Sequence, residues 1–177
     1  MIQSRLDYCS QIWSPQGAAD IRLLEDVQRK FTSRIAGMDS LNYRERLKEL
    51  RLYSQERRRE RYAIIFLWKV AMGLVKGYSV QFNSSGRRGR LCSVTDTPRI
   101  APAHVRRARD ASLAVRGAKI FNMLPADLRN ITCDKVTTFK RSLDKFLSKI
   151  PDEPTIDEQG RAAETNSLVD QIPQSRF

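Results

Sequence analysis

Histidine and cysteine are scarce in this sequence of 177 residues. The single histidine, His104, lies among prolines and arginines, where nothing predicts a rigid element to orient an imidazole for nucleophilic catalysis. The three cysteines, Cys9, Cys92 and Cys133, are odd in number and far apart. They therefore form neither a disulfide framework nor paired CxxC zinc ligands. We expect no catalytic residue, no metal, no cofactor and a reducing compartment.

Phosphate-binding loops and rigid carboxylate pairs are also missing. No GxxxxGK[ST] or GxGxxG pattern occurs. Two-metal phosphoryl chemistry needs carboxylates held close together, and no adjacent acid pair follows a strand pattern. Asp152-Glu153 and Asp157-Glu158 lie in a C-terminal segment with no apolar pattern to hold them. The isolated chain is therefore not expected to be an enzyme.

Hydrophobic runs are too short for a membrane helix. The first residues, MIQSRLDYCSQIW, contain no continuous apolar segment of the kind found in secretory signals. The most apolar stretch, residues 62–75, includes Lys69 and is shorter than the ~20 residues that span a bilayer. We expect a cytoplasmic or nuclear protein that is not secreted.

Positive charge is what the sequence has in excess, with a formal net charge of +12. Residues 151–177 hold six acids and two bases, a net of −4, which leaves +16 on residues 1–150. A body this basic attracts polyanions, so we expect the phosphate backbone of RNA or DNA as partner and no membrane. Two alternatives are that the cations only keep the helices soluble or that they contact an acidic membrane surface.

Apolar periodicity predicts a mainly α fold, a helical bundle. Residues 20–37 repeat apolar side chains at steps of three and four, with Asp20 as N-cap. Residues 134–150 do the same, with Asp134 as N-cap. Asn42 and Glu45 have the spacing of a capping box at the start of a second, short helix.

A further helix is expected from its N-cap Ser54 onward, polar and in solvent at its start and buried at its end. Its first turns carry the run QERRRERY, whose arginines oppose the helix dipole. A bound phosphate or a neighbouring acid would offset these cations. The remaining alternative is a solvated, frayed helix start.

Glycines, prolines and arginines crowd into residues 76–111, which we interpret as an irregular basic arm able to wrap a phosphate backbone. Residues 90–95 fit a short strand, and residues 112–118 are the plausible partner for a small β-hairpin. The arginine run and this arm supply the predicted nucleic-acid-binding residues. They are Arg57, Arg58, Arg61, Arg87, Arg88, Arg90, Arg106, Arg107 and Arg109.

The chain divides into four regions on these patterns. Residues 1–75 and 112–150 are helical and are expected to pack on each other. Residues 76–111 form the basic arm between them. Residues 151–177 are acidic and unpatterned, which indicates a disordered tail.

Several stretches resemble, in this order, the C-terminal end of jockey-like non-LTR retrotransposon reverse transcriptases. They are SRLDYCSQIWSP, DIRLLEDVQRKFTSRIAGMDSLNYRERLKELRL, SQERRRERY and FNMLPADL followed by FKRSLDKFL. The resemblance covers roughly residues 4–147. It departs at Phe121, where the family usually has tryptophan, and at Leu113, where an aromatic residue is common.

The resemblance implies a location downstream of the polymerase palm, with residues 1–75 as a thumb-like helical region. The palm and its catalytic carboxylates are absent from this chain, so we expect sequence-independent nucleic-acid binding without polymerase activity. An upstream palm domain would then be a partner in the full-length element. The alternative is a non-catalytic helical protein-interaction remnant with no nucleic-acid role. Leu6, Tyr8 and Trp13 look like the end of an element packed against upstream residues, so exposed apolar surface is expected.

Overall fold

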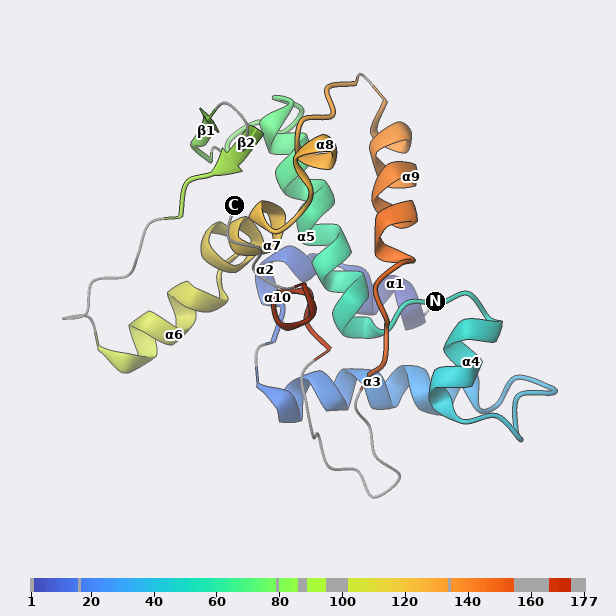
Figure 1. The fold of residues 1–177 in the computed structure, drawn as a ribbon. Helices are drawn as coiled ribbons and strands as arrows, with labels where there is room; N and C mark the ends of the chain where they lie inside the picture. The colour runs from blue at the N-terminus through green and yellow to red at the C-terminus, as the bar shows by residue number, and fades with distance from the viewer. Residues whose placement is uncertain are drawn as a thin grey trace.

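The chain is mainly α-helical, as its periodicity predicts, and includes a two-stranded antiparallel hairpin (Figure 1). The computed structural model describes residues 2–15, 17–78, 80–85, 89–94, 102–133, 135–154 and 166–172. Its helices and strands are α1 (Ile2–Asp7), α2 (Ser10–Trp13), α3 (Ala18–Thr32), α4 (Tyr43–Glu49), α5 (Gln55–Ala71), β1 (Phe82–Ser85), β2 (Gly89–Cys92), α6 (Ala103–Ala111), the π-helix η2 (Leu113–Gly117), α7 (Ala118–Asn122), α8 (Ala126–Arg129), α9 (Val136–Leu147) and α10 (Leu168–Gln171).

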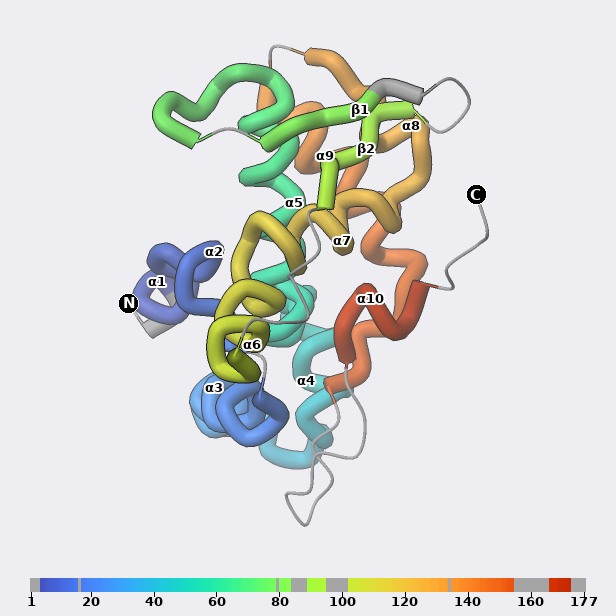
Figure 2. Tube along the Cα trace, turned by 90° about the vertical axis from the view of Figure 1, so that its left-hand side faces the viewer, coloured from blue at the N-terminus to red at the C-terminus, as the bar shows by residue number. Residues whose placement is uncertain are grey.

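Helix α5 runs through the middle of the molecule, with the other helices around it (Figures 1 and 2). Its second half contributes Ile64, Leu67 and Trp68 to the hydrophobic core, each fully buried. The Trp68 ring stacks on Phe139 of α9, with ring centroids 4.6 Å apart. The indole nitrogen of Trp68 donates to the carbonyl of Ile131 at 2.9 Å, so its polar atom is also paired. Helices α5, α7, α8 and α9 thus share one core.

Local capping signals are confirmed at two helices. Asn42 Oδ1 accepts from the Glu45 amide at 3.0 Å, and the Glu45 carboxylate accepts from the Asn42 amide at 2.8 Å. Ser54 Oγ accepts from the Arg57 amide at the start of α5. Asp20 is not the N-cap of α3, because that helix begins at Ala18 after Gly17. Asp134, the predicted cap of α9, lies outside the described residues.

The hairpin is built differently from the prediction. Strand β2 pairs with β1, in a register that sets Phe82 opposite Cys92 and Ser85 opposite Gly89. The predicted partner, residues 112–118, forms η2 and the start of α7 instead. A strand close by in sequence closes a shorter loop and so pairs at lower entropic cost. The Asn122 side chain bonds both the amide and the carbonyl of Cys92, which fixes β2 against α7.

Residues 103–111 form helix α6, where an irregular segment was predicted. Pro102 precedes its first residue and has no amide hydrogen to leave unpaired at a helix start. No residue of α6 is buried, and the helix extends to the left of the core in Figure 1.

The start of α5 is buried, whereas the sequence predicted a solvated start. Gln55, Glu56, Arg57, Arg59 and Glu60 are each at most 7% exposed. Other parts of the chain cover these residues and form hydrogen bonds with the side chains of Gln55, Glu56, Arg57 and Glu60. Such bonds offset the cost of burying polar and charged groups. Arg59 differs, because its Nε and Nη2 have no hydrogen-bond partner among the described residues.

The predicted disorder of residues 151–177 is wrong for residues 166–172. Leu168 is fully buried and belongs to the hydrophobic core, and α10 follows from it. The chain returns to the start of α5 there, with Asn166 and Ser167 also buried. Residues 155–165 and 173–177 lie outside the described residues.

Candidate nucleic-acid interface

Arg57 lies in the core and not on a nucleic-acid-binding surface. Its side chain is 0% exposed. Nη2 donates to the carbonyl of Pro151 at 3.0 Å and also bonds the carbonyl of Asn166 and Oε1 of Gln171. The predicted phosphate contact does not fit this placement, because the side chain is fully buried and Nη2 already bonds three oxygens of the C-terminal segment.

Arg58 and Arg61 each bind an aspartate through two guanidinium nitrogens. Arg58 Nε and Nη2 donate to Asp7 at 2.9 and 2.8 Å. Arg61 Nε and Nη2 donate to Asp144 at 2.6 and 2.8 Å. The sequence predicts that a phosphate or a neighbouring acid offsets these cations. In the structure Asp7 and Asp144 are such acids, and bidentate pairing of an arginine with a carboxylate is strong. A role of Arg58 or Arg61 in phosphate binding stays a prediction that requires exchange of these bonds.

Helix α6 carries the best exposed cations among the predicted residues. Arg106 and Arg107 are exposed, and neither forms an ion pair with another described residue. Arg109 on the same helix is half-buried and has an interaction partner. Arg90 is half-buried in β2, while Arg87 and Arg88 lie outside the described residues. Arg106, Arg107 and Arg109 therefore share helix α6, whereas the predicted residues of α5 and β2 lie on other elements.

Buried carboxylates form a polar cluster in the interior, which the sequence did not reveal. Glu60 is 1% exposed and accepts from Leu168 N at 2.9 Å, Ser167 Oγ at 2.5 Å and Arg116 Nη2 at 3.2 Å. Burial raises its pKa to about 7, although Arg116 and these hydrogen bonds act in the opposite direction. Glu56 is also buried, and burial raises its pKa as well.

Glu25 of α3 is a comparable buried carboxylate. It accepts from the Tyr43 hydroxyl at 2.6 Å and from the Glu56 amide at 3.1 Å. Burial raises its pKa to about 7, and these hydrogen bonds lower it less than burial raises it. Glu56 and Glu60 stand within the arginine run QERRRERY, but no local pattern showed that either acid, or Glu25, would be enclosed.

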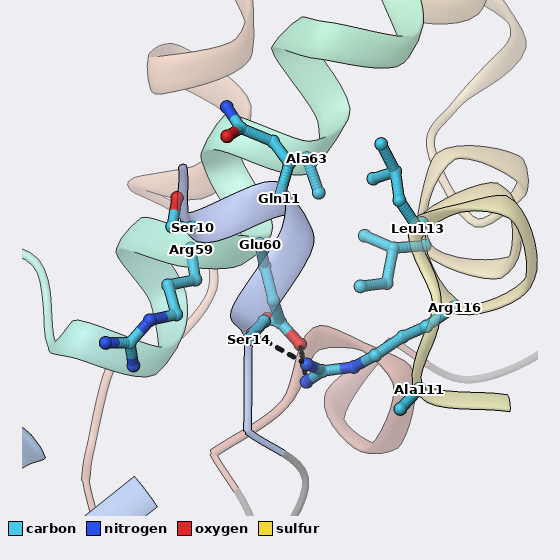
Figure 3. A pocket seen from close by; sticks show the side chains of 11 residues that line it. Ser10, Gln11, Ser14, Arg59, Glu60, Ala63, Ala111, Leu113 and Arg116 are labelled. Carbon is cyan, nitrogen blue, oxygen red and sulfur yellow. Dashed lines mark hydrogen bonds and ion pairs between the residues drawn. The ribbon is translucent and has the colours of Figure 1, made fainter. Parts of the chain in front are cut away.

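A small pocket lies between α2, α5 and η2 (Figure 3). Arg116 points into it toward Glu60 and Ser14, and its guanidinium bonds both. Arg59 points away from that contact and lies under the ring of Trp13, 4.8 Å from the ring centroid. The carboxylate in this pocket is thus already engaged by a cation and by α10, so the arrangement holds elements together.

Two buried carboxylates in the described part of the chain, Glu25 and Glu60, have a raised pKa. Perturbed carboxylates such as Glu25 and Glu60 are the type of group that general acid–base catalysis uses. Both are occupied by internal partners, while His104 is exposed on α6. Within the described ranges no group of three or more His, Cys, Asp or Glu residues could hold a metal ion.

The described helices include none that is both long and apolar enough to cross a membrane. Comparison with protein-family models, curated proteins and solved structures gave no match.

Proposed function

We propose that this chain binds the phosphate backbone of RNA or DNA without sequence specificity, with α6 as the primary contact. It acts as a non-catalytic fragment that corresponds to the thumb and post-thumb region of a non-LTR retrotransposon reverse transcriptase. The palm of such an enzyme would be its natural neighbour in a full-length element.

One observation carries the assignment to α6. This helix has no buried residue, yet it displays Arg106 and Arg107 to solvent without an acidic partner among the described residues. Exposed cations that form no internal ion pair remain available to bind an external anion. The three predicted arginines of α5, by contrast, are occupied: Arg58 by Asp7, Arg61 by Asp144 and Arg57 by the C-terminal segment.

The net charge of +12 supports a long-range attraction to the same partner. If five or six cations engage phosphates, the logarithm of the association constant falls against the logarithm of salt concentration with a slope of about −4 to −5. This slope is measured by fluorescence anisotropy with labelled single-stranded RNA and duplex DNA of mixed sequence. Absence of binding at low salt, or binding that ignores salt, would overturn the proposal.

The double variant R106A/R107A tests the position of the contact. Loss of two phosphate contacts should make the slope shallower by about 2 and weaken binding to every sequence alike. The matched control is K145A/K149A, which removes the same charge from exposed lysines near the end of α9. An equal loss in both double variants would show that net charge alone determines binding and that α6 is not the contact.

A further inference from the structure

Helix α3 attaches to the rest of the protein through its polar side. Glu25, Gln28 and Thr32 are each at most 4% exposed. Gln28 Nε2 donates to the Tyr53 carbonyl at 2.9 Å, and Arg46 Nε donates to Thr32 Oγ1 at 3.3 Å. Together with the bond between Glu25 and Tyr43, these contacts fasten the helix by hydrogen bonds.

Part of the apolar side of α3 faces solvent as a consequence, while Ile21 and Leu24 are half-buried. Leu23, Val27 and Phe31 are 65%, 37% and 55% exposed. They stand four residues apart and so form one stripe along the helix, here called the α3 stripe. An amphipathic helix ordinarily turns its apolar face inward. Contiguous exposed apolar side chains of this kind mark an interaction surface.

Charged residues of opposite sign stand at the two ends of the α3 stripe. Asp20 lies in the first turn of α3, three residues before Leu23, and Arg34 lies in the turn that follows α3, three residues after Phe31. Both are exposed. The order acid, Leu23, Val27, Phe31, base is symmetric about Val27 in position and opposite in charge. This surface is complementary to an antiparallel copy of itself.

We propose that the α3 stripe binds the α3 stripe of a second copy of this chain, as an antiparallel pair with a two-fold axis at Val27. Leu23 then lies against Phe31 of the second copy, and Asp20 lies opposite Arg34 of the second copy. A two-fold interface must be self-complementary in this way. A parallel pair would set Asp20 against Asp20 and Arg34 against Arg34, so the charges select the antiparallel arrangement.

A single helix face buries little area, which places the dimer in the weak, reversible class. The net charge of +12 on each copy opposes association. Salt screens that repulsion over a Debye length but leaves the apolar contact in place. Self-association should therefore strengthen as salt increases, whereas binding to a phosphate backbone should weaken. The two properties are distinguishable in one salt series.

Sedimentation equilibrium of the full chain, over a series of protein and salt concentrations, measures the association directly. The wild type should form a dimer that dissociates on dilution. V27K sets two lysines against each other at the two-fold axis and should weaken the dimer by about tenfold or more. L74K is the matched control, since Leu74 is 53% exposed and lies after the end of α5, outside the stripe. It should leave association unchanged.

A charge swap tests the antiparallel geometry. D20R and R34D should each weaken the dimer, and the double variant D20R/R34D should restore it, because opposite charges again face each other. Circular dichroism confirms that each variant keeps its helix content. A wild-type chain that stays monomeric at every concentration would overturn the proposal. So would a double variant weaker than both single variants, because Asp20 and Arg34 would then not face each other across the two-fold axis.

Discussion

The guanidinium of Arg57 is a structural group that fastens the C-terminal segment to α5. It bonds oxygens of Pro151, Asn166 and Gln171, which all lie beyond the last residue of α9. Its charge also lowers the pKa of Glu56, although burial raises that pKa more. Removal of Arg57 would therefore leave one buried and two partly buried oxygen acceptors without this donor, which is more costly than loss of an exposed contact.

The variant R57A should lower the free energy of unfolding by about 3 kcal/mol. The control R107A removes an exposed arginine of α6 and should change it by less than about 0.5 kcal/mol. Urea unfolding followed by tryptophan fluorescence measures both. A fully stable R57A chain with weakened RNA binding would instead assign Arg57 to the nucleic-acid contact.

Local sequence patterns could not separate the paired arginines from the exposed ones. Asp7 lies 51 residues from Arg58, and Asp144 lies 83 residues from Arg61. Such pairs depend on the tertiary fold, and no spacing rule within one helix reports them. Arg106 and Arg107 were predicted as nucleic-acid-binding residues only because residues 76–111 are rich in arginine. The structure distinguishes them from the paired arginines of α5, because α6 is exposed.

Helix α10 is short and yet belongs to the core, because its first residue supplies a buried leucine. Leu168 is 0% exposed and packs in the same cluster as Trp68, and its amide donates to Glu60. The variant L168A should lower the free energy of unfolding by about 3 kcal/mol, through lost burial and the cavity left behind.

The control L74A truncates a leucine that is 53% exposed. It should cost less than about 0.5 kcal/mol in the same urea titration. Equal stability of L168A and L74A would contradict the packing of α10 on α5.

Elements whose capping residues lie within a few positions of each other were predictable from the sequence. Elements held by contacts between residues far apart in the sequence were not. The capping box at Asn42 and the cap at Ser54 are complete within four residues, so the sequence located α4 and the start of α5. The amide of Leu168 bonds Glu60 across 108 residues. The acidic composition around α10 therefore resembled disorder. The orientation of α3 was equally hidden, because Glu25 and Gln28 find their partners on other elements.

Buried acids join four other elements to α5. Glu25 connects α3 to α4 and to the start of α5, and Glu60 connects α5 to α10 and, through Arg116, to η2. A protein with a large positive net charge thus holds acids in its interior, and the charge of these acids depends on pH. The free energy of unfolding should therefore change with pH as they bind or release protons.

The sign of that dependence follows from the raised pKa values. The pKa of Glu25 and of Glu60 is about 7 in the folded chain against an ordinary value of 4.5. Between these values the folded chain keeps protons that the unfolded chain has released. The stability that these two groups contribute is therefore complete below pH 4.5, decreases as pH rises toward 7 and is lost above it.

Urea unfolding across this pH interval, with wild type and E60Q in parallel, isolates the contribution of Glu60. Glutamine resembles the protonated acid and cannot release a proton. The free energy of unfolding of E60Q, relative to that of wild type, should therefore be lowest at low pH and increase as pH rises to 7. The control E49Q alters an exposed carboxyl at the end of α4. Its difference from wild type should be constant across the interval. A difference between E60Q and wild type that is equally flat would mean that Glu60 binds protons equally in the folded and unfolded chain, so that its pKa is not raised by folding.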